Sequence, residues 1–241
     1  MILITRPREK AKQLAAQLKK KNINSRTDSL ISFYLKNIKI NFEPYSDCLI
    51  ASVQAVNAIK QKHRKEIKHL KKCNHYVIGD EAAKALRALR ITKIKKVFHN
   101  SDELLNYLST STYRIKKLCY LSSNVNNTKL LKKLDLLKVN YKREIIYSVR
   151  PKAKLTLKTV NDLRAEHIHV VTLFSLYTAQ TYINLVYSAN LSKSAEKLVH
   201  ICLSDDIAIF MRRKGYKKAI ASKSPLEYSL IQSVAEFMAK Q

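Results

Sequence analysis

Glycine is almost absent from this chain, with only two glycines in 241 residues. Loops that wrap phosphates or expose a catalytic serine need glycine, because the backbone must turn sharply or approach the ligand closely. The sequence has no GxGxxG, no P-loop lysine motif and no GxSxG. Most nucleotide-binding and α/β-hydrolase classes are therefore excluded.

Cysteine and paired metal ligands are also scarce. The four cysteines are far apart in the sequence and form no CxxC pair, which argues against a disulfide scaffold or zinc finger and favours a reducing compartment. Among seven histidines, only His167 and His169 are close together. Their place at the start of an expected strand favours ordinary strand or surface histidines, so we expect no metal.

Long hydrophobic runs are missing as well. No stretch approaches the roughly 18 apolar residues that a membrane span needs, and the apolar run that opens the chain is too short for a signal peptide. Hydrophobic residues nevertheless make up 46% of the chain, enough for a folded core. We expect a soluble, cytoplasmic protein, and a monomer, with no membrane partner.

Acidic residues are few: 18 against 46 lysines and arginines, a formal charge of +28. Such a balance suggests an anionic partner. The lysines, however, are scattered in pairs along the chain, apart from 19–21 and 62–72. This favours drift in composition over a dedicated surface, so the charge permits an anionic ligand without identifying one.

Short apolar runs alternate with longer amphipathic segments, a pattern typical of α/β folds with parallel sheets. The expected strands are 2–5, 23–31, 48–51, 75–79, 96–98, 118–122, 141–147, 169–174, 198–203 and 218–221. The expected helices are 7–20, 52–68, 81–90, one opening at 101, 127–137, 155–165, 178–187, 207–214 and 224–240. The dipeptide Arg150-Pro151 predicts a break after the seventh strand.

The pattern repeats weakly within the chain. A strand, a serine and a helix at 49–52 recur at 172–175, and a strand, a cap and an alanine-rich helix at 77–89 recur at 199–211. We therefore expect two doubly wound units, with ligands at the carboxyl ends of the strands.

Polar residues stand where the expected helices begin. We expect Ser52, Asp80, Ser101, Ser175 and either Ser204 or Asp205 to cap their helices, because a side-chain oxygen there accepts from an otherwise unbonded N–H. Capping alone is one explanation of the serines after strands. The other is that the remaining N–H groups of these turns bind carboxylates.

Several segments, taken in order, resemble the uroporphyrinogen-III synthase family. Each is weak alone, but together they span nearly the whole chain. They are Ile2–Pro7 (a "TRP" turn), Leu30–Phe33, Ile50–Val56 (like "FTSxxAV"), Val77–Ala83 (like "VGxxTA"), Ile146–Val149 (like "VYxT"), Thr172–Ser175 (the second "FTS" turn), Lys214–Tyr216 and Ala221–Pro225.

The resemblance implies two flavodoxin-like, doubly wound parallel-sheet domains. The first comprises residues 1–30 plus 152–241 and the second residues 36–146. A two-stranded linker, 31–35 and 147–151, joins them, and the active site is the cleft between the domains.

The resemblance also implies the reaction. Linear hydroxymethylbilane loses its hydroxyl, inverts its terminal ring and closes as uroporphyrinogen III, without a cofactor. By the same resemblance Tyr147 assists departure of the hydroxyl. The residues implied for substrate binding are Arg6, Ser52, Val53, Gly79, Asp80, Asn124, Ser175, Leu176 and Ser204.

Several positions depart from the family pattern. Ala82 and Ile207 stand where its threonines are expected, and Ser204 stands where its second such turn has a glycine. Asn124 and Thr128 stand where a loop of the family carries a glycine and a basic residue, and Tyr177 replaces a serine. The synthase reading is preferred, and two alternatives remain. One is a decayed, non-catalytic two-domain protein that binds anions. The other is a basic nucleic-acid-binding protein, although no recognition motif is present.

Overall fold

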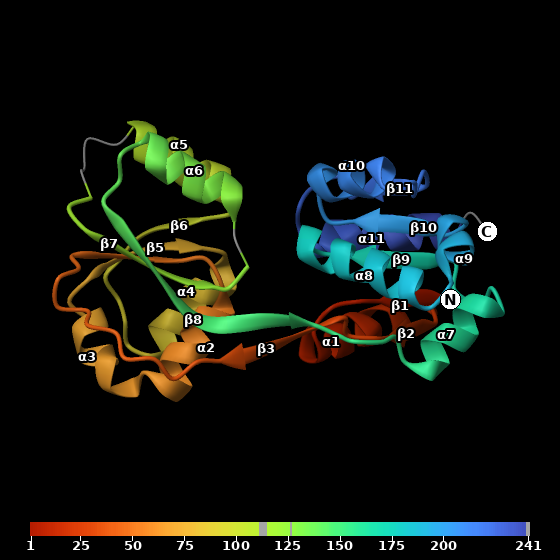
Figure 1. Ribbon diagram of the computed structural model, residues 1–241, viewed down its shortest axis with the longest axis horizontal. Helices are drawn as coiled ribbons and strands as arrows, with labels where there is room; N and C mark the ends of the chain where they lie inside the picture. Colours follow the sequence, from red (N-terminus) through yellow and green to blue (C-terminus); the bar gives the residue numbers. More distant parts are fainter. Residues whose placement is uncertain (111–114, 126, 240–241) are drawn as a thin grey trace. The chain divides into compact units, whose positions relative to one another are not determined.

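The computed structural model describes residues 1–110, 115–125 and 127–239, and the chain divides into two compact units (Figure 1). Unit 1 comprises Met1–Ser32 and Arg150–Gln241, and unit 2 comprises Phe33–Val149. Each unit is an α/β body around its own sheet. All neighbouring strands pair in parallel from β11 to β2 in the first sheet and from β8 to β6 in the second, so the α/β class is confirmed.

The sheet of unit 1 has the strand order β11-β10-β9-β1-β2. Its central strands are apolar along most of their length, because helices cover both faces of a parallel sheet. Every residue of β1 and β9 is buried. The strands are β1 (Ile2–Ile4), β2 (Ser25–Thr27), β9 (Val170–Leu173), β10 (Val199–Cys202) and β11 (Ala219–Ala221).

The helices of unit 1 pack in two layers. One core cluster lies under α7 (Leu157–Arg164), α8 (Leu176–Ser188), α9 (Ser192–Glu196) and α10 (Asp205–Arg213). The other lies under α1 (Arg8–Lys19) and α11 (Glu227–Met238). The apolar stripe of α1, at Ala11, Leu14 and Leu18, is the buried face of that helix, as its spacing predicts.

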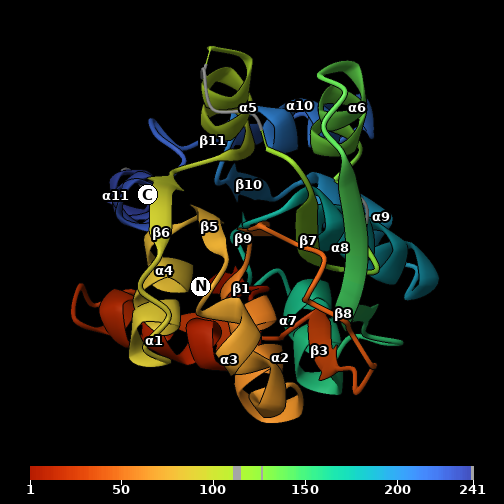
Figure 2. The same ribbon diagram turned by 90° about the vertical axis from the view of Figure 1, so that its left-hand side faces the viewer.

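The sheet of unit 2 has the order β3-β8-β7-β4-β5-β6. Figure 2, turned toward this unit, shows β6, β5, β7 and β8 in succession. The strands are β3 (Ile31–Leu35), β4 (Asp47–Ile50), β5 (Asn74–Ile78), β6 (Ile94–Phe98), β7 (Leu118–Ser123) and β8 (Tyr141–Pro151).

Two helical layers also flank this second sheet. On one face α5 (Ser101–Thr110) and α6 (Thr128–Leu136) cover an apolar cluster that includes Phe98 and Leu130. On the other face lie α2 (Val53–Lys62) and α4 (Asp80–Ala88). The short η1 (Arg64–Glu66) and α3 (Ile67–Leu70) follow α2 along the chain.

The two sheets place their strands in corresponding positions but in a different order along the chain. In unit 1, β9, β10 and β11 are neighbours, and β1 and β2 continue the sheet beyond β9. In unit 2, β4, β5 and β6 are neighbours, and β7 and β8 continue it beyond β4. The pair that comes first along the chain in unit 1, β1 and β2, therefore corresponds to the pair that comes last along the chain in unit 2, β7 and β8.

The beginnings of two helices differ from expectation. Asp80 does not cap α4: the cap position is Gly79, at φ 92°, and Asp80 is the first helical residue. A positive φ of this size favours glycine. At α10 the cap position is Ser204, as one of the two expected alternatives, but its side chain makes no capping hydrogen bond.

At α5 the cap is Asn100, not Ser101. The Asn100 side chain accepts from the Glu103 amide at 2.9 Å. In return, the Glu103 carboxylate accepts from the His99 amide at 2.7 Å. The pair resembles a capping box displaced by one residue from the expected start, except that the carboxylate accepts from the residue before the cap and not from the cap's own amide.

Some strand and helix limits also differ. The expected helix 52–68 stops at Lys62, since His63 leaves helical geometry and its ring bonds to the Lys36 carbonyl at 3.0 Å. The expected strand 23–31 is two strands, β2 and β3. Strand β8 continues through Arg150-Pro151, so the predicted break is wrong. Helix α9 was not expected. The last helix, expected over 224–240, begins only at Glu227, and Lys240 lies outside the described residues.

One buried histidine interrupts the core of unit 1. The His200 side chain has no exposed surface and packs edge-on against the rings of Tyr182 and Tyr216, at centroid distances of 5.4 and 5.0 Å. Burial lowers the pKa of His200 to about 3, because an imidazolium in an apolar site has lost its hydration.

We predict that His200 makes unit 1 sensitive to acid. The unfolded chain takes up a proton near pH 6.5 and the folded chain only near pH 3, so stability is complete above pH 6.5 and falls, by on the order of a few kcal/mol, as the pH drops toward 3. His200→Phe should lose less stability between pH 7 and pH 4 than the parent, measured by urea unfolding followed by circular dichroism. His99→Phe, at an exposed position, is the control. Equal losses in all three proteins would contradict the prediction.

Candidate active site

The predicted binding residues lie at the carboxyl ends of the strands of each unit. In a parallel sheet these ends share one edge, and the helices that follow point their N-termini there. In unit 1 this edge carries Arg6 after β1, Ser175 after β9 and Ser204 after β10, on three neighbouring strands. Side chains far apart in sequence are thus gathered at one edge.

Unit 2 has a corresponding group. Tyr147 lies on β8, Asn124 follows β7, Ser52 follows β4 and Gly79 follows β5. These four strands are consecutive in the sheet order β8-β7-β4-β5. Two separate sets therefore form, one within each unit.

Two of the helices at these edges open with a capped turn that carries no acidic residue. Ser52 accepts from the Gln54 amide and Ser175 from the Thr178 amide, each at 3.1 Å. The first helical residues are Val53 and Leu176, and Leu176 is 48% exposed. The N-terminal dipole of α2 and α8 is not opposed by a carboxylate of their own first turn, which favours the approach of an anion.

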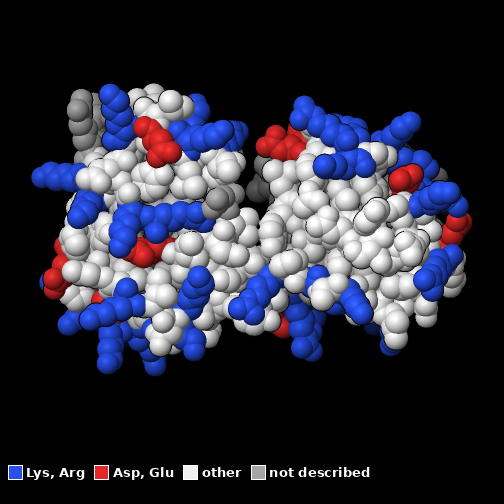
Figure 3. Space-filling model, viewed as in Figure 1, with Lys and Arg blue, Asp and Glu red and all other residues white. Residues whose placement is uncertain are grey.

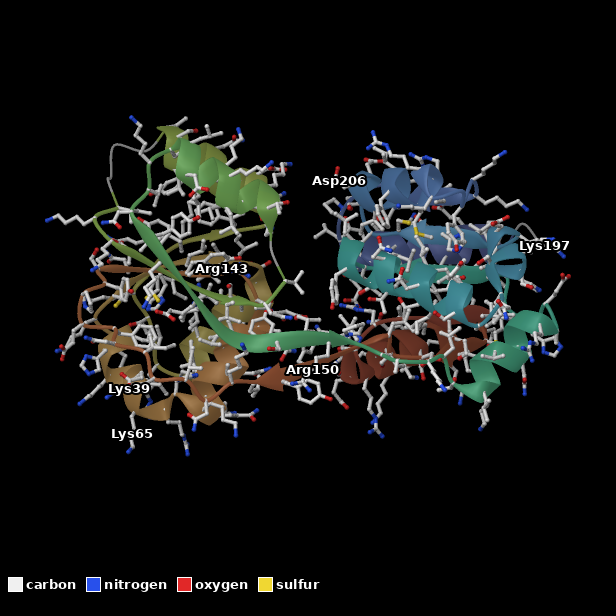
Figure 4. The ribbon with its side chains drawn as sticks, viewed as in Figure 1. Lys39, Lys65, Arg143, Arg150, Lys197 and Asp206 are labelled. Carbon is white, nitrogen blue, oxygen red and sulfur yellow. The ribbon has the colours of Figure 1, made fainter. Side chains whose placement is uncertain are left out.

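The other two helices differ. Asp80 and Glu81 occupy the first turn of α4, and Asp205 and Asp206 that of α10. These acids stabilise their helices through the dipole, and they also compete with any carboxylate that approaches. Figure 4 labels Asp206 at the start of α10.

Arg6 is held by its own unit. Its Nη1 lies 2.6 Å from Oε2 of Glu227, its guanidinium stands 4.1 Å from the centroid of the Phe174 ring, and its side chain is only 14% exposed. Sequence reasoning identified Arg6 but not its two partners. Glu227 starts α11 and Phe174 follows β9, and no local pattern connects either residue to Arg6.

Asn124 uses its side-chain amide within unit 2. Its Oδ1 accepts from the Val149 amide at 2.7 Å, and its Nδ2 donates to the Val149 carbonyl at 3.3 Å. The side chain thereby joins the turn after β7 to β8, two residues beyond Tyr147.

Tyr147 is 7% exposed and packs edge-to-face against Phe33, with ring centroids 6.1 Å apart. Among the described residues its hydroxyl has no hydrogen-bond partner. Tyr120 is buried to a similar degree, and burial, with a smaller contribution from Tyr147, raises the pKa of Tyr120 to about 12. Two phenols therefore lie near each other at this edge, and Tyr147 is the one expected from the sequence.

Arg143, which sequence reasoning missed, reaches the same edge. It donates from Nε to the Ser122 hydroxyl at 2.7 Å and from Nη2 to the carbonyls of Ser123 and Val125. Figure 4 labels it on unit 2. An arginine in the middle of a strand gives no sequence signal of its own, because its partners come from a turn about twenty residues earlier.

Within the described part of the chain, no group of three or more His, Cys, Asp or Glu side chains is placed to hold a metal ion. No helix there combines the length and apolar character that a bilayer crossing requires. The cationic side chains are spread over both units on the face drawn in Figure 3, where they greatly outnumber the acidic ones.

Comparison with known families identifies the family of the chain. A family model described as uroporphyrinogen-III synthase HemD matches residues 12–232. The chain belongs to the uroporphyrinogen-III synthase family. Its members are cyclising lyases of haem biosynthesis. The reaction that follows from the family is the closure of hydroxymethylbilane, with inversion of the terminal ring, to uroporphyrinogen III.

Solved structures agree in fold. The chain is similar to the crystal structure of uroporphyrinogen-III synthetase from Helicobacter pylori 26695, with TM-score 0.69, 16% identity and 98% of each chain covered. It is also similar to a mutant uroporphyrinogen III synthase from the extremely thermophilic bacterium Thermus thermophilus, with TM-score 0.63 and 11% identity, covering 100% of this chain and 99% of that one. No curated protein matches at a significant level.

The two serine caps of unit 1 provide a matched test of the local geometry. Ser175→Ala removes the acceptor of the Thr178 amide and should lower the free energy of unfolding by about 1 kcal/mol. Ser204→Ala removes no capping hydrogen bond and should have little effect. Urea unfolding of both variants measures this. A larger loss from Ser204→Ala would show that its hydroxyl has a structural partner.

Proposed function

We propose that this chain carries out the synthase reaction with Tyr147 as the proton donor and with helix N-termini as the binding sites for the substrate's carboxylates. The observation that carries the proposal is the gathering of Tyr147, Ser52, Gly79 and the turn at Asn124 on four consecutive strands of one sheet edge. Unit 1 supplies Ser175, Leu176, Ser204 and Arg6.

Carboxylate binding rests on main-chain donors. Hydroxymethylbilane carries acetate and propionate groups on its rings, and the first N–H groups of a helix are unbonded donors at the positive end of the helix dipole. The caps at Ser52 and Ser175 leave further N–H groups of α2 and α8 for such anions. The net charge of +28 speeds the capture of a polyanion.

The departures from the family pattern at the two threonine positions fit this view. Ala82 and Ile207, in the first turns of α4 and α10, are both buried, with 2% and 4% exposed. Their side chains belong to the core, so these helices offer the substrate main-chain N–H groups and not hydroxyls. The loss of a threonine therefore removes one possible contact and leaves the backbone site.

The reaction requires one proton to be given to the leaving group and one to be recovered from the product. The carbon–oxygen bond of the hydroxymethyl group breaks with its electron pair on oxygen, and the Tyr147 hydroxyl supplies the proton that turns the departing hydroxide into water. The closed tetrapyrrole releases one proton as its rings regain aromaticity, and this proton restores the phenol. A general acid in such a step contributes roughly 10²–10⁴ in rate.

The remaining task is geometric. Closure without inversion competes with the enzymatic product, so the protein must hold the chain where only one ring carbon reaches the reactive end. Orientation of this kind supplies large effective concentrations, on the order of 10⁵ M or more in favourable cases. Multiple carboxylate contacts serve this purpose because they fix several rings at once.

The finer architecture is part of the same proposal. The order of unit 1, counted along its own strands, is 2-1-3-4-5, which supports a flavodoxin-like assignment. Unit 2 departs from that order, although its strands occupy corresponding positions. We keep the expected division of the chain. The first domain comprises residues 1–30 plus 152–241, the second comprises residues 36–146, and the linker comprises 31–35 and 147–151. A monomer in the cytoplasm without a cofactor remains our prediction.

Product analysis tests the activity itself. Purified protein is incubated with hydroxymethylbilane, the product is oxidised, and the isomers I and III are separated by chromatography. We expect predominantly isomer III. Isomer I alone, at the rate seen without protein, would leave the decayed, non-catalytic alternative.

Removing the Tyr147 hydroxyl tests the proton donor. Tyr147→Phe keeps the ring packed against Phe33 and should lower kcat by roughly 10²–10⁴ with circular dichroism unchanged. Tyr187→Phe, at an exposed position on α8, is the control and should retain full activity. Unchanged turnover in Tyr147→Phe would refute the role.

The acidic first turn of α10 gives a further prediction. Replacing Asp205 and Asp206 together by asparagine removes two charges that compete with a substrate carboxylate, and KM should fall several-fold in low salt. Glu166→Gln combined with Glu236→Gln, exposed acids elsewhere in unit 1, changes the net charge equally and should leave KM nearly unchanged. Equal effects of both pairs would assign the gain to overall charge.

A further inference from the structure

Strand β8 carries a register shift immediately before Tyr147. The pairing with β7 runs regularly to Ser122 opposite Ile145, and the next pair is Ser123 opposite Tyr147. Ile146 is thus an extra residue on β8, which defines a β-bulge. Since successive side chains of a strand alternate between faces, one extra residue reverses the face of every residue that follows it. The direction of Tyr147 depends on this bulge.

The extra residue is anchored on its other side. The Ile146 carbonyl accepts from the Lys36 amide at 2.9 Å, and the Ile146 side chain has no exposed surface. The bulge is therefore held in place. The Ile146 carbonyl is hydrogen-bonded to the residue that follows β3, and the Ile146 side chain is buried in the core.

Arg143 fixes the strand on the N-terminal side of the bulge. Its guanidinium bonds to the Ser122 hydroxyl and to the carbonyls of Ser123 and Val125. Ser122 and Ser123 are the two residues between which the register shifts. A planar fork with several donors holds such a turn in one geometry, which an ammonium group does not reproduce.

Asn124 fixes the strand on the C-terminal side. Its side chain makes two hydrogen bonds, one to the amide and one to the carbonyl of Val149. They resemble the paired main-chain bonds between two strands, at a point beyond the register shift. Arg143 and Asn124 thus tie the same turn, Ser122–Val125, to β8 at points four residues before and two residues after Tyr147.

We propose that Arg143 and Asn124 are positioning residues for the synthase reaction: together they stabilise the bulge at Ile146 and so aim the Tyr147 hydroxyl at the leaving group. This rests on the proposed proton-donor role of Tyr147. Neither residue needs to touch the substrate. Their effect on the rate acts through the tyrosine.

A double-mutant cycle tests the proposal. Arg143→Lys keeps the charge and loses the fork, and kcat should fall by about ten- to a hundredfold, the range in which a misplacement near 1 Å affects catalysis. In the Tyr147→Phe background the same substitution should change kcat by less than about twofold, because the group that it aims is already gone. Circular dichroism and urea unfolding are recorded for each protein.

A second variant and a control complete the design. Asn124→Asp keeps an acceptor for the Val149 amide but loses the donor to its carbonyl, and it should show the same dependence on Tyr147 with a smaller loss. Arg212→Lys is the control. Arg212 also donates to a main-chain carbonyl, that of Ala219 at 2.6 Å, but lies in unit 1, so its kcat should be unchanged in both backgrounds.

The outcomes separate the two proposals. A large loss in Tyr147→Phe, with equal losses from Arg143→Lys in both backgrounds, would retain the proton donor and overturn the positioning role. A rise in KM with unchanged kcat would also overturn it, since Arg143 would then bind substrate directly. Full activity of Tyr147→Phe would overturn both. If Arg143→Lys fails to fold, the same cycle with Asn124→Asp decides the question.

Discussion

The first N–H groups of a helix have no hydrogen-bond partner within the helix. These unbonded donors are the constraint around which both units are organised. A parallel sheet collects several such helix beginnings at one edge. The buried strands and the two helical layers hold those beginnings in place. Where a serine accepts from one amide, as Ser52 and Ser175 do, the neighbouring amides keep their orientation toward an incoming anion.

The electrostatics of the four helices are not uniform. Those after β4 and β9 begin without acids, and those after β5 and β10 begin with two acids each. The contrast follows the internal repeat of the chain, so each unit pairs one open helix N-terminus with one that is already charge-neutralised. Within each unit, an anion therefore finds one helix N-terminus that favours its approach and one that opposes it.

Much of the fold followed from the sequence because its signals are local. The alternation of apolar runs predicted the parallel sheets. The caps at Ser52 and Ser175 lie where the sequence places them, and the cap at Asn127 is the first residue of the helix expected there. The misses required information from distant segments. His63 ends a helix by bonding to Lys36, and β8 passes through Arg150-Pro151 as an extended strand. The candidate site divides similarly. The motifs single out Tyr147 and the serines as candidates, whereas Arg143 depends on a turn that only the register of β7 and β8 brings near.

The permuted strand order has a consequence for the history of the chain. Suppose that one ancestral α/β unit was copied into another. The inserted copy then needs its first and last residues close together. A copy with the original strand order does not meet this need when its ends lie on strands that are far apart. Here Lys36, near the start of unit 2, is hydrogen-bonded to Ile146, near its end. A circular permutation, which joins the original ends of such a copy and opens the chain at this point, would give a unit that can be inserted into another unit at a single position. The hydrogen bond that joins the two ends of unit 2 is also the one that holds the residue before Tyr147, so the junction of this unit with the rest of the chain and the proposed reactive phenol share one stretch of backbone.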